Sequence, residues 1–334
     1  MSLPHRALKL VARPDGVPKD SDFALHEASP AALGEGQIRV AVRYLSIDPA
    51  MRVWMSEQKS YWPPVPLGDV MRAAGIGEVI ESQHPRYPVG TWVSGMTGVQ
   101  NQVVSDGKGL RPFDAKSLPH PAWALSVFGA TGLTAWFGLT DIGKVQAGET
   151  VVVSAASGAV GSTVVQIARN LGCRVIGIAG GPEKCAYVKD TLGADAVIDY
   201  KHEKVGKALS AHCPDGIDVY FDNVGGEILD AALSRLRMHA RIVLCGGISQ
   251  YNATEAVRGP VNYLSLISAR ARMEGFVVLD YLDRANEAMA AMAPWAAAGK
   301  LVSKIDELEG LEHFAEALRR VYSGANFGKQ VLKV

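Results

Sequence analysis

The chain has 334 residues, enough for two domains, and 48% of them are hydrophobic. Its 34 basic and 34 acidic side chains give a formal net charge of zero, which does not favour nucleic acid or an anionic membrane surface as a partner. Residues Met1 to Leu10 contain no apolar signal core, and no apolar run is long enough to span a membrane. We therefore expect a soluble, cytoplasmic protein.

Residues 1–120 are expected to be mostly β-structure. Short strands are predicted at Gln37–Arg43, Ala74–Glu81 and Thr91–Met96, separated by turns rich in glycine and proline. The segment Tyr61–Pro66 (YWPPVP) contains too much proline for a helix or a central strand, so it is predicted to be an ordered loop.

From Leu125 onward the pattern changes to alternating helices and strands. Leu125–Thr140 has the apolar spacing of a helix. The elements expected after it are 151–155, 160–171, 174–178, 182–192, 196–199, 217–221, 226–234, 240–245 and 273–278. This alternation predicts a parallel sheet with helices on both faces, that is, a doubly wound α/β domain. The final segment, Ala325–Val334, ends in the strand QVLKV and is expected to return to the first domain.

The stretch Val151–Gly161 (VVVSAASGAVG) carries the most informative motif. Three valines form a short buried strand, and Ala156-x-Gly158-x-x-Gly161 then opens a helix. This is a dinucleotide fingerprint with alanine at its first glycine. Gly158 would let the backbone approach a pyrophosphate, Gly161 would let helix and strand pack closely, and N–H groups at the helix start would hold the phosphate charge. The alternative is a glycine-rich turn that binds no ligand.

The end of the next strand, Arg174–Ile178, indicates which dinucleotide is bound. A site for NAD(H) usually places Asp or Glu about 20 residues beyond the glycines, on the ribose 2′-hydroxyl. Here that place holds Gly180-Gly181-Pro182, and Glu183 is followed at once by Lys184. Small residues and a lysine leave room and a cation for a 2′-phosphate, so NADP(H) is predicted. The alternative is that Lys184 is an ordinary solvated lysine.

The cysteines give no sign of a metal site. Cys173, Cys185, Cys213 and Cys245 are at least 12 residues apart, which matches no zinc motif, and a chain without a secretion signal is not expected to form a disulfide framework. We expect four buried, unreactive thiols. The eight histidines form no ligand pattern either, so no metal is predicted.

Several segments together resemble one enzyme family. They are Tyr44–Arg52 (YLSIDPAMR), Pro66–Val79, Gly129–Trp136, Phe221–Gly226, Cys245–Asn252 and Asn326–Lys329. These segments, spread over nearly the whole chain, resemble the medium-chain dehydrogenase/reductase superfamily. Within it they are similar to the zinc-free branch of prostaglandin reductases, leukotriene B4 12-hydroxydehydrogenases, 2-alkenal double-bond reductases and curcumin-reductase-like enzymes.

The resemblance implies the domains and the assembly. It implies a Rossmann-type doubly wound parallel sheet domain at 125–299 and a mostly-β GroES-like catalytic domain at 1–124 and 300–334. Related enzymes commonly dimerise by joining sheet edges across a two-fold axis. The apolar segment Glu274–Val278 is predicted to be such an edge, so we expect a homodimer.

The resemblance also implies the cofactor site. The pyrophosphate would lie on Gly158, Ala159, Val160 and Gly161, and the 2′-phosphate on Lys184 and Tyr200. The ribose and nicotinamide ends would lie on Asn223, Cys245, Gly246, Gly247, Ile248, Ser249, Gln250, Tyr251, Phe276, Val277, Val278 and Asn326. The alternatives are that Asn223 is only a turn residue and that Tyr200 is only a surface tyrosine.

The expected chemistry is the reduction of an activated C=C bond. Without a metal pattern to polarise a carbonyl, interconversion of alcohol and ketone is hard to arrange. Hydride addition to the β-carbon of an enone is easier, because the substrate's own carbonyl delocalises the charge as an enolate. The resemblance makes Tyr251 the candidate for the polar role beside the nicotinamide ribose, and the alternative is a tyrosine that caps its own loop. Tyr44 and Tyr61 are weaker candidates for pocket walls.

We therefore expect an NADPH-dependent reductase of α,β-unsaturated aldehydes and ketones. A quinone reductase of the same superfamily and a non-catalytic NADPH-binding protein are the alternatives.

Two departures from the family bear on the substrate. The family box usually has tyrosine or phenylalanine where this chain has Ala50, which predicts a wider pocket. The segment Asp69–Arg72 is more polar than the usual pocket loop, so the natural substrate stays open.

Overall fold

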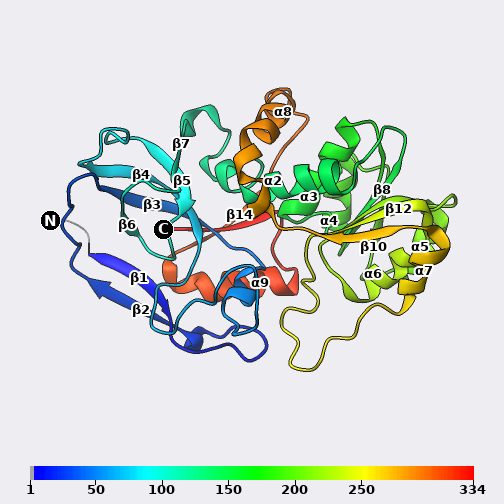
Figure 1. The fold of residues 1–334 in the computed structure, drawn as a ribbon, viewed down its shortest axis with the longest axis horizontal. Helices are drawn as coiled ribbons and strands as arrows, with labels where there is room; N and C mark the ends of the chain where they lie inside the picture. Colours follow the sequence, from blue (N-terminus) through cyan, green and yellow to red (C-terminus); the bar gives the residue numbers. More distant parts are fainter. Residues whose placement is uncertain (1–3) are drawn as a thin grey trace. The chain divides into compact units, whose positions relative to one another are not determined.

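The computed structural model describes residues 4–334, which separate into two compact units (Figure 1). Unit 1 comprises the described residues up to Leu125 together with Ile305–Val334, and unit 2 comprises Ser126–Lys304. No helix in residues 4–334 is long and apolar enough to cross a membrane.

Unit 2 is built on a parallel sheet of six strands in the order β10-β9-β8-β11-β12-β13. Its strands are β8 (Thr150–Val153), β9 (Arg174–Ala179), β10 (Ala196–Asp199), β11 (Ile217–Asp222), β12 (Leu236–Leu244) and β13 (Arg272–Gly275). All neighbouring pairs are parallel. The strand order reverses between β8 and β11, and sheets of this kind bind ligands at the carboxyl ends of the strands beside such a reversal.

Helices cover both faces of this sheet (Figure 1). One face carries α2 (Ala130–Phe137) with η4 (Gly138–Ile142), α3 (Ala159–Asn170), α4 (Pro182–Ala186) with η5 (Tyr187–Thr191), and α8 (Ala285–Ala297). The other carries α5 (Val205–His212), α6 (Gly226–Leu233) and α7 (Ser265–Ala269). Successive side chains of a strand point to opposite faces of the sheet. Accordingly, Val151 and Val153 belong to the hydrophobic core on the α3 face, and Val152 belongs to the core on the α6 face. The predicted doubly wound α/β fold is confirmed.

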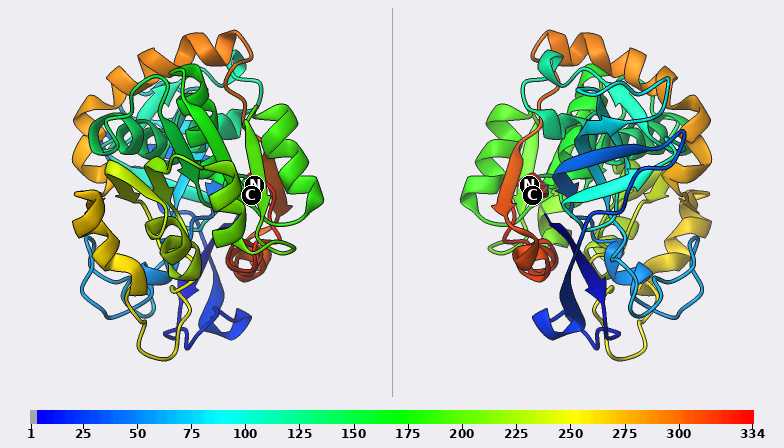
Figure 2. Two further views of the ribbon diagram at one scale, coloured as in Figure 1. Left: turned by 90° about the vertical axis from the view of Figure 1, so that its right-hand side faces the viewer. Right: turned by 90° about the vertical axis from the view of Figure 1, so that its left-hand side faces the viewer.

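Unit 1 is mostly β-structure. Its main sheet has seven strands in the order β14-β15-β3-β4-β5-β7, with β6 paired to β3, and β1 and β2 form a separate antiparallel ribbon, dark blue in Figure 2. The strands are β1 (His5–Leu10), β2 (Phe23–Ala28), β3 (Ile38–Ser46), β4 (Ala74–Ser82), β5 (Trp92–Met96), β6 (Gln102–Ser105), β7 (Arg111–Phe113), β14 (Ile305–Glu309) and β15 (Lys329–Lys333). Its α-helices are α1 (Met51–Trp54) and α9 (Phe314–Ser323). Because β15 pairs with β3, the chain end returns to this unit as expected.

The structure corrects several predicted boundaries. Residues Pro121–Leu125 form a separate short 3₁₀ turn, so the helix predicted from Leu125 begins only after its N-cap, Gly129. The predicted strand 273–278 ends at Gly275, because the partner strand β12 ends at Leu244, and Val278–Arg284 forms a 3₁₀ helix. The helices α1, α5, α7, α8 and α9 were not predicted.

Candidate functional site

Three loops of unit 2 meet at the carboxyl ends of β8, β11 and β12. The backbone N–H of Asn223, after β11, donates to Ser154 Oγ at 2.8 Å, and its side-chain amide donates to the Ser154 carbonyl at 2.8 Å. The Asn223 carbonyl accepts from the N–H of Ile248, after β12, at 3.2 Å. These bonds bring three of the predicted cofactor segments to the place where the strand order reverses.

In the glycine loop between β8 and α3, the space beside Gly158 is open, whereas the space beside Gly161 is filled by backbone. A Cβ built on Gly158 would meet only the Ala155 carbonyl oxygen, at 3.2 Å, whereas one built on Gly161 would lie 2.2 Å from the same oxygen. Gly158 is also the N-cap of α3, and no side chain among residues 4–334 caps the helix there. The first N–H groups of a helix have no intrahelical partner. An open glycine next to an uncapped helix start is the arrangement that fits a pyrophosphate, and Ala159 and Val160 form the first turn.

A buried carboxylate fixes the neighbouring loop. Asp222 accepts hydrogen bonds from Tyr220 OH at 2.9 Å and from Ser154 Oγ at 3.1 Å. It also accepts from the N–H groups of Val224 and Gly225, each at 3.0 Å. Burial raises the pKa of Asp222, although these donors partly offset the effect. Asp222 was not among the predicted site residues. The signal for its role was an Asp directly before Asn-Val-Gly-Gly, a pattern typical of side-chain bonds to nearby N–H groups.

Tyr251 closes the loop that follows β12. Its hydroxyl accepts from the Gly247 N–H at 3.1 Å, and a Cβ on Gly246 would come within 3.0 Å of it. The structure therefore shows the loop-capping contact that was the alternative to a catalytic role. The neighbouring Asn252 leaves its buried Oδ1 without a donor in the described part of the chain. An unpaired buried acceptor is expected where a ligand completes the site.

The two residues predicted for the 2′-phosphate, Lys184 and Tyr200, lie around the end of β9. The Tyr200 ring, from the end of β10, packs against Gly180, where a Cβ would come within 2.7 Å of it. Lys184 is half-buried in α4, which begins after Gly181 at a φ of +91°. Asp199, which was not predicted to belong to the site, accepts a hydrogen bond from the Gly181 N–H at 2.9 Å and so fixes this turn.

Hydrogen bonds around the end of β9 favour the ionised form of Asp199. Burial alone would raise the pKa of Asp199, but hydrogen bonds from Gly181, His202 and Lys201 hold it below its usual value. The Asp199 carboxylate thus accepts hydrogen bonds from three donors that lie just after β9 and β10.

The remaining predicted residues make local contacts. Phe276 follows β13 and packs on Tyr281, with ring centroids 6.3 Å apart, and Val277 and Val278 are half-buried beside it. In unit 1, Asn326 donates to the Gly328 carbonyl at 3.0 Å. The contacts of Phe276 and Asn326 shown by the structure are therefore those of a core residue and a turn residue.

The two tyrosines predicted as pocket walls also belong to unit 1. Tyr44 on β3 packs edge-to-face on His120, with centroids 5.2 Å apart. The Tyr61 hydroxyl accepts from Trp54 Nε1 at 3.2 Å, and Tyr61 is 47% exposed. Tyr61 therefore presents the more accessible surface of the two.

An ion pair joins two segments of unit 1 that are far apart in the sequence. Lys329 on β15, with its side chain only 1% exposed, lies 2.7 Å from Asp48 and donates to the Ile47 carbonyl at 3.1 Å. Ser46 Oγ also donates to Asp48. This contact joins the segments Tyr44–Arg52 and Asn326–Lys329.

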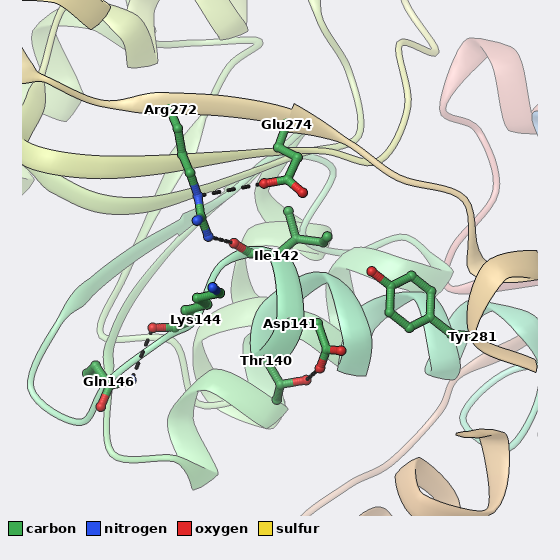
Figure 3. A pocket seen from close by; sticks show the side chains of 8 residues that line it. All are labelled: Thr140, Asp141, Ile142, Lys144, Gln146, Arg272, Glu274 and Tyr281. Atoms are coloured by element: carbon green, nitrogen blue, oxygen red, sulfur yellow. Dashed lines mark hydrogen bonds and ion pairs between the residues drawn. The ribbon is translucent and has the colours of Figure 1, made fainter. Parts of the chain in front are cut away.

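A polar cavity of about 680 Å³ lies elsewhere on unit 2 (Figure 3). It is lined by Thr140, Asp141, Ile142, Lys144, Gln146, Arg272, Glu274 and Tyr281. Arg272 pairs with Glu274 at 3.7 Å and donates to the Ile142 carbonyl, and Asp141 pairs with Arg284. None of the predicted cofactor residues lines this cavity, so we do not assign the cofactor site to it.

The four cysteines are free thiols whose pKa values are raised by burial. Burial raises the pKa of Cys173 and Cys185 to about 11 and that of Cys245 to about 12. Burial also raises the pKa of Cys213. Raised pKa values favour protonated, weakly nucleophilic thiols at neutral pH. The predicted burial is confirmed for Cys173 and Cys213, whereas Cys185 and Cys245 are half-buried. Within residues 4–334, no cluster of three or more His, Cys, Asp or Glu side chains is arranged to hold a metal ion.

Comparison with known proteins identifies the family. The family models for the N-terminal domain of oxidoreductase and for zinc-binding dehydrogenase match residues 6–113 and 159–297. The chain is 41% identical to the NADPH-dependent curcumin reductase of Escherichia coli, over 99% of this chain and 97% of that protein. It is 40% identical to the NADP⁺-dependent 2-alkenal reductase of Nicotiana tabacum, over 96% of this chain and 94% of that protein.

A solved structure is similar to this chain in both fold and sequence. The crystal structure of CurA from Vibrio vulnificus in complex with NADPH has a TM-score of 0.93 and 43% identity, covering 98% of this chain and 99% of that one. The chain thus belongs to the medium-chain dehydrogenase/reductase superfamily, in its branch of NADPH-dependent curcumin, 2-alkenal and prostaglandin reductases. The resemblance, the fold class and the enzyme class predicted from the sequence are confirmed.

Proposed function

We propose that this protein is an NADPH-dependent reductase of the activated C=C bond of α,β-unsaturated aldehydes and ketones. The observation that carries the proposal is the open Gly158 surface at the uncapped start of α3, beside the reversal of strand order. Relatives similar over nearly the whole chain are named as reductases of curcumin and 2-alkenals.

The residues of unit 2 fit the cofactor. Gly158 and the first N–H groups of α3 would hold the pyrophosphate, and Lys184 and Tyr200 would hold the 2′-phosphate. Asn223 and the loop Cys245–Tyr251, fixed by Ser154 and Asp222, would line the ribose and nicotinamide ends. When bound, NADPH supplies the hydride that adds to the β-carbon of the double bond.

The protein must also stabilise the negative charge that develops on the substrate's carbonyl oxygen. A preorganised hydrogen-bond donor is the usual means. We infer that Tyr251 is this donor, because it lies in the predicted cofactor loop and the bond from the Gly247 N–H orients its phenol hydroxyl. The same contact fixes the position of the hydroxyl.

A screen of NADPH oxidation over enals, enones, quinones and nitroalkenes, with product analysis, tests the proposal. We expect enals and enones to be reduced at the C=C bond with the carbonyl intact. Turnover of quinones alone would replace the proposal with a quinone reductase. NADPH binding without oxidation by any of these electrophiles would indicate a non-catalytic binding protein.

A further inference from the structure

The carboxylate of Asp222, the last residue of β11, connects two of the loops predicted to bind the cofactor. It accepts hydrogen bonds from the N–H groups of Val224 and Gly225 in the loop after β11, at 3.0 Å each. It also accepts from Ser154 Oγ, after β8, at 3.1 Å. Ser154 Oγ in turn accepts from the Asn223 N–H at 2.8 Å. The three N–H groups that follow Asp222 are therefore directed to this carboxylate, either directly or through one hydroxyl.

The backbone of Asp222 holds the third loop. Its carbonyl accepts from the N–H groups of Cys245 and Gly246, after β12, at 2.9 and 3.1 Å. The N–H of Ile248 donates to the carbonyl of the neighbouring Asn223 at 3.2 Å. The loop after β12 is thus bonded to the two residues whose conformation the carboxylate fixes.

The chemistry of Asp222 suits it to hold these loops. Asp222 is 1% exposed, and Tyr220 OH also donates to its carboxylate, at 2.9 Å. An ionised carboxylate only accepts hydrogen bonds, so it can satisfy several donors at once. Bonds to a charged group are stronger than neutral ones, and burial strengthens them further. The loops are therefore ordered before any ligand arrives, which lowers the entropic cost of binding.

The residues predicted for the two ends of the cofactor lie on different parts of the sheet edge. The loops bonded to Asp222 follow β8, β11 and β12, whereas Lys184 and Tyr200 lie around the ends of β9 and β10. In the strand order, β9 and β10 are on one side of β8, and β11 and β12 are on the other. A change at Asp222 should therefore affect the predicted nicotinamide end and leave the predicted 2′-phosphate end in place.

We propose that Asp222 is a positioning residue for the nicotinamide half of the cofactor. It holds Asn223 and the loop Cys245–Tyr251 in the arrangement that receives the nicotinamide and its ribose. This inference rests on the proposed function, which assigns these loops to NADPH, and deepens it by naming the group that sets their geometry. Asp222 acts through the loops, because its carboxylate is buried and accepts from donors of the protein itself.

Asp222→Asn tests the proposal, because it keeps the shape of the side chain but replaces one acceptor oxygen by an NH₂ group that only donates. Calorimetric titration compares NADPH with adenosine 2′,5′-bisphosphate, a fragment of the cofactor that lacks the nicotinamide half. We expect Asp222→Asn to weaken NADPH binding by about 10-fold, the effect of leaving buried donors unpaired, and to leave the affinity for the bisphosphate unchanged. Lys184→Ala should weaken the binding of both ligands.

Asp218→Asn is the matched control. Asp218 lies on the same strand, is 7% exposed and accepts from the Thr150 N–H at 2.9 Å, but it is near the amino end of β11, away from the cofactor loops. We expect this variant to have a lower Tm and wild-type affinity for NADPH.

A second variant, Ser154→Ala, keeps the carboxylate and removes only the hydroxyl between it and the Asn223 N–H. It should show a smaller loss of NADPH affinity, again with the bisphosphate unaffected. This variant decides the question if Asp222→Asn does not fold.

Equal losses of affinity for NADPH and for the bisphosphate would overturn the inference, since Asp222 would then only support the fold of unit 2. Wild-type affinity for NADPH in both Asp222→Asn and Ser154→Ala would overturn it as well. In either case NADPH binding by the wild-type protein leaves the proposed function standing. A wild-type protein that binds neither ligand would overturn the proposed function and this inference with it. Because the readout is binding, the result does not depend on which electrophile the enzyme reduces.

Discussion

Replacing each glycine of the phosphate loop by alanine should separate the loop's two roles. At Gly158, with φ −81°, the new methyl would have one neighbour within 4 Å, the Ala155 carbonyl oxygen at 3.2 Å. At Gly161 the methyl would lie 2.2 Å from that oxygen and 2.8 Å from the carbonyl carbon. Since non-bonded carbon contacts are comfortable only near about 3.5 Å, Gly161→Ala must displace backbone by about 1 Å, whereas Gly158→Ala need not.

The stability changes follow from these contacts. Removing a helix glycine would by itself stabilise unit 2 by about 0.5–1 kcal/mol. Overpacking costs about 1–3 kcal/mol, and more where the crowded atoms are backbone, so we expect Gly161→Ala to lose about 2 kcal/mol. For a unit of this size that corresponds to a fall in Tm of about 4–8 °C. Gly158→Ala only exchanges one N-cap residue for a poorer one, which costs about 1 kcal/mol or less.

The effects on cofactor binding should be different for the two variants. In Gly158→Ala the methyl lies in the space assigned to the pyrophosphate, so NADPH affinity should fall about 10-fold or more, equivalent to about 1.4 kcal/mol. NADPH fluorescence titration measures the affinity, and thermal unfolding without cofactor measures the stability. If Gly158→Ala binds NADPH as tightly as wild type, the pyrophosphate does not approach this glycine. An unchanged Tm for Gly161→Ala would refute the close-packing argument.

Four further outcomes are expected. Lys184→Ala should weaken NADPH binding by about 10-fold or more and leave NADH use unchanged, measured as KM for each cofactor; equal losses would indicate a folding defect instead. Tyr251→Phe should lower kcat for an enone by about 100-fold with NADPH affinity nearly retained, and an unaltered kcat would restrict Tyr251 to capping its loop. Asp48→Asn should destabilise unit 1 by about 3 kcal/mol in thermal unfolding, because it leaves the buried Lys329 charge unpaired; a small change would show that solvent reaches the ammonium. Finally, β13 is the edge strand of the six-stranded sheet, and such an edge can pair with the same edge of a second copy. We therefore expect a homodimer in light scattering at micromolar concentration, and a monomeric mass would contradict this prediction.

Local patterns in the sequence were sufficient for much of the fold. The valines of β8 and the following Gly158 and Gly161 are neighbours in the chain, so their spacing alone predicts a strand, a tight turn and a helix. The same holds for β10, found at Ala196–Asp199 as predicted. The helix α8 escaped prediction because its alanine-rich sequence has a weak apolar stripe and contains Pro294.

The site depended on contacts that local patterns do not contain. Asp48 and Lys329 are 281 residues apart, and only the antiparallel pairing of β3 with β15 brings them together. Asn223 meets Ser154 because β8 and β11 are adjacent in the sheet. The sequence thus determined which segments form strands, helices and glycine turns, since those depend on neighbouring residues. The tertiary structure alone decided which side chains meet, because that depends on strand order and register.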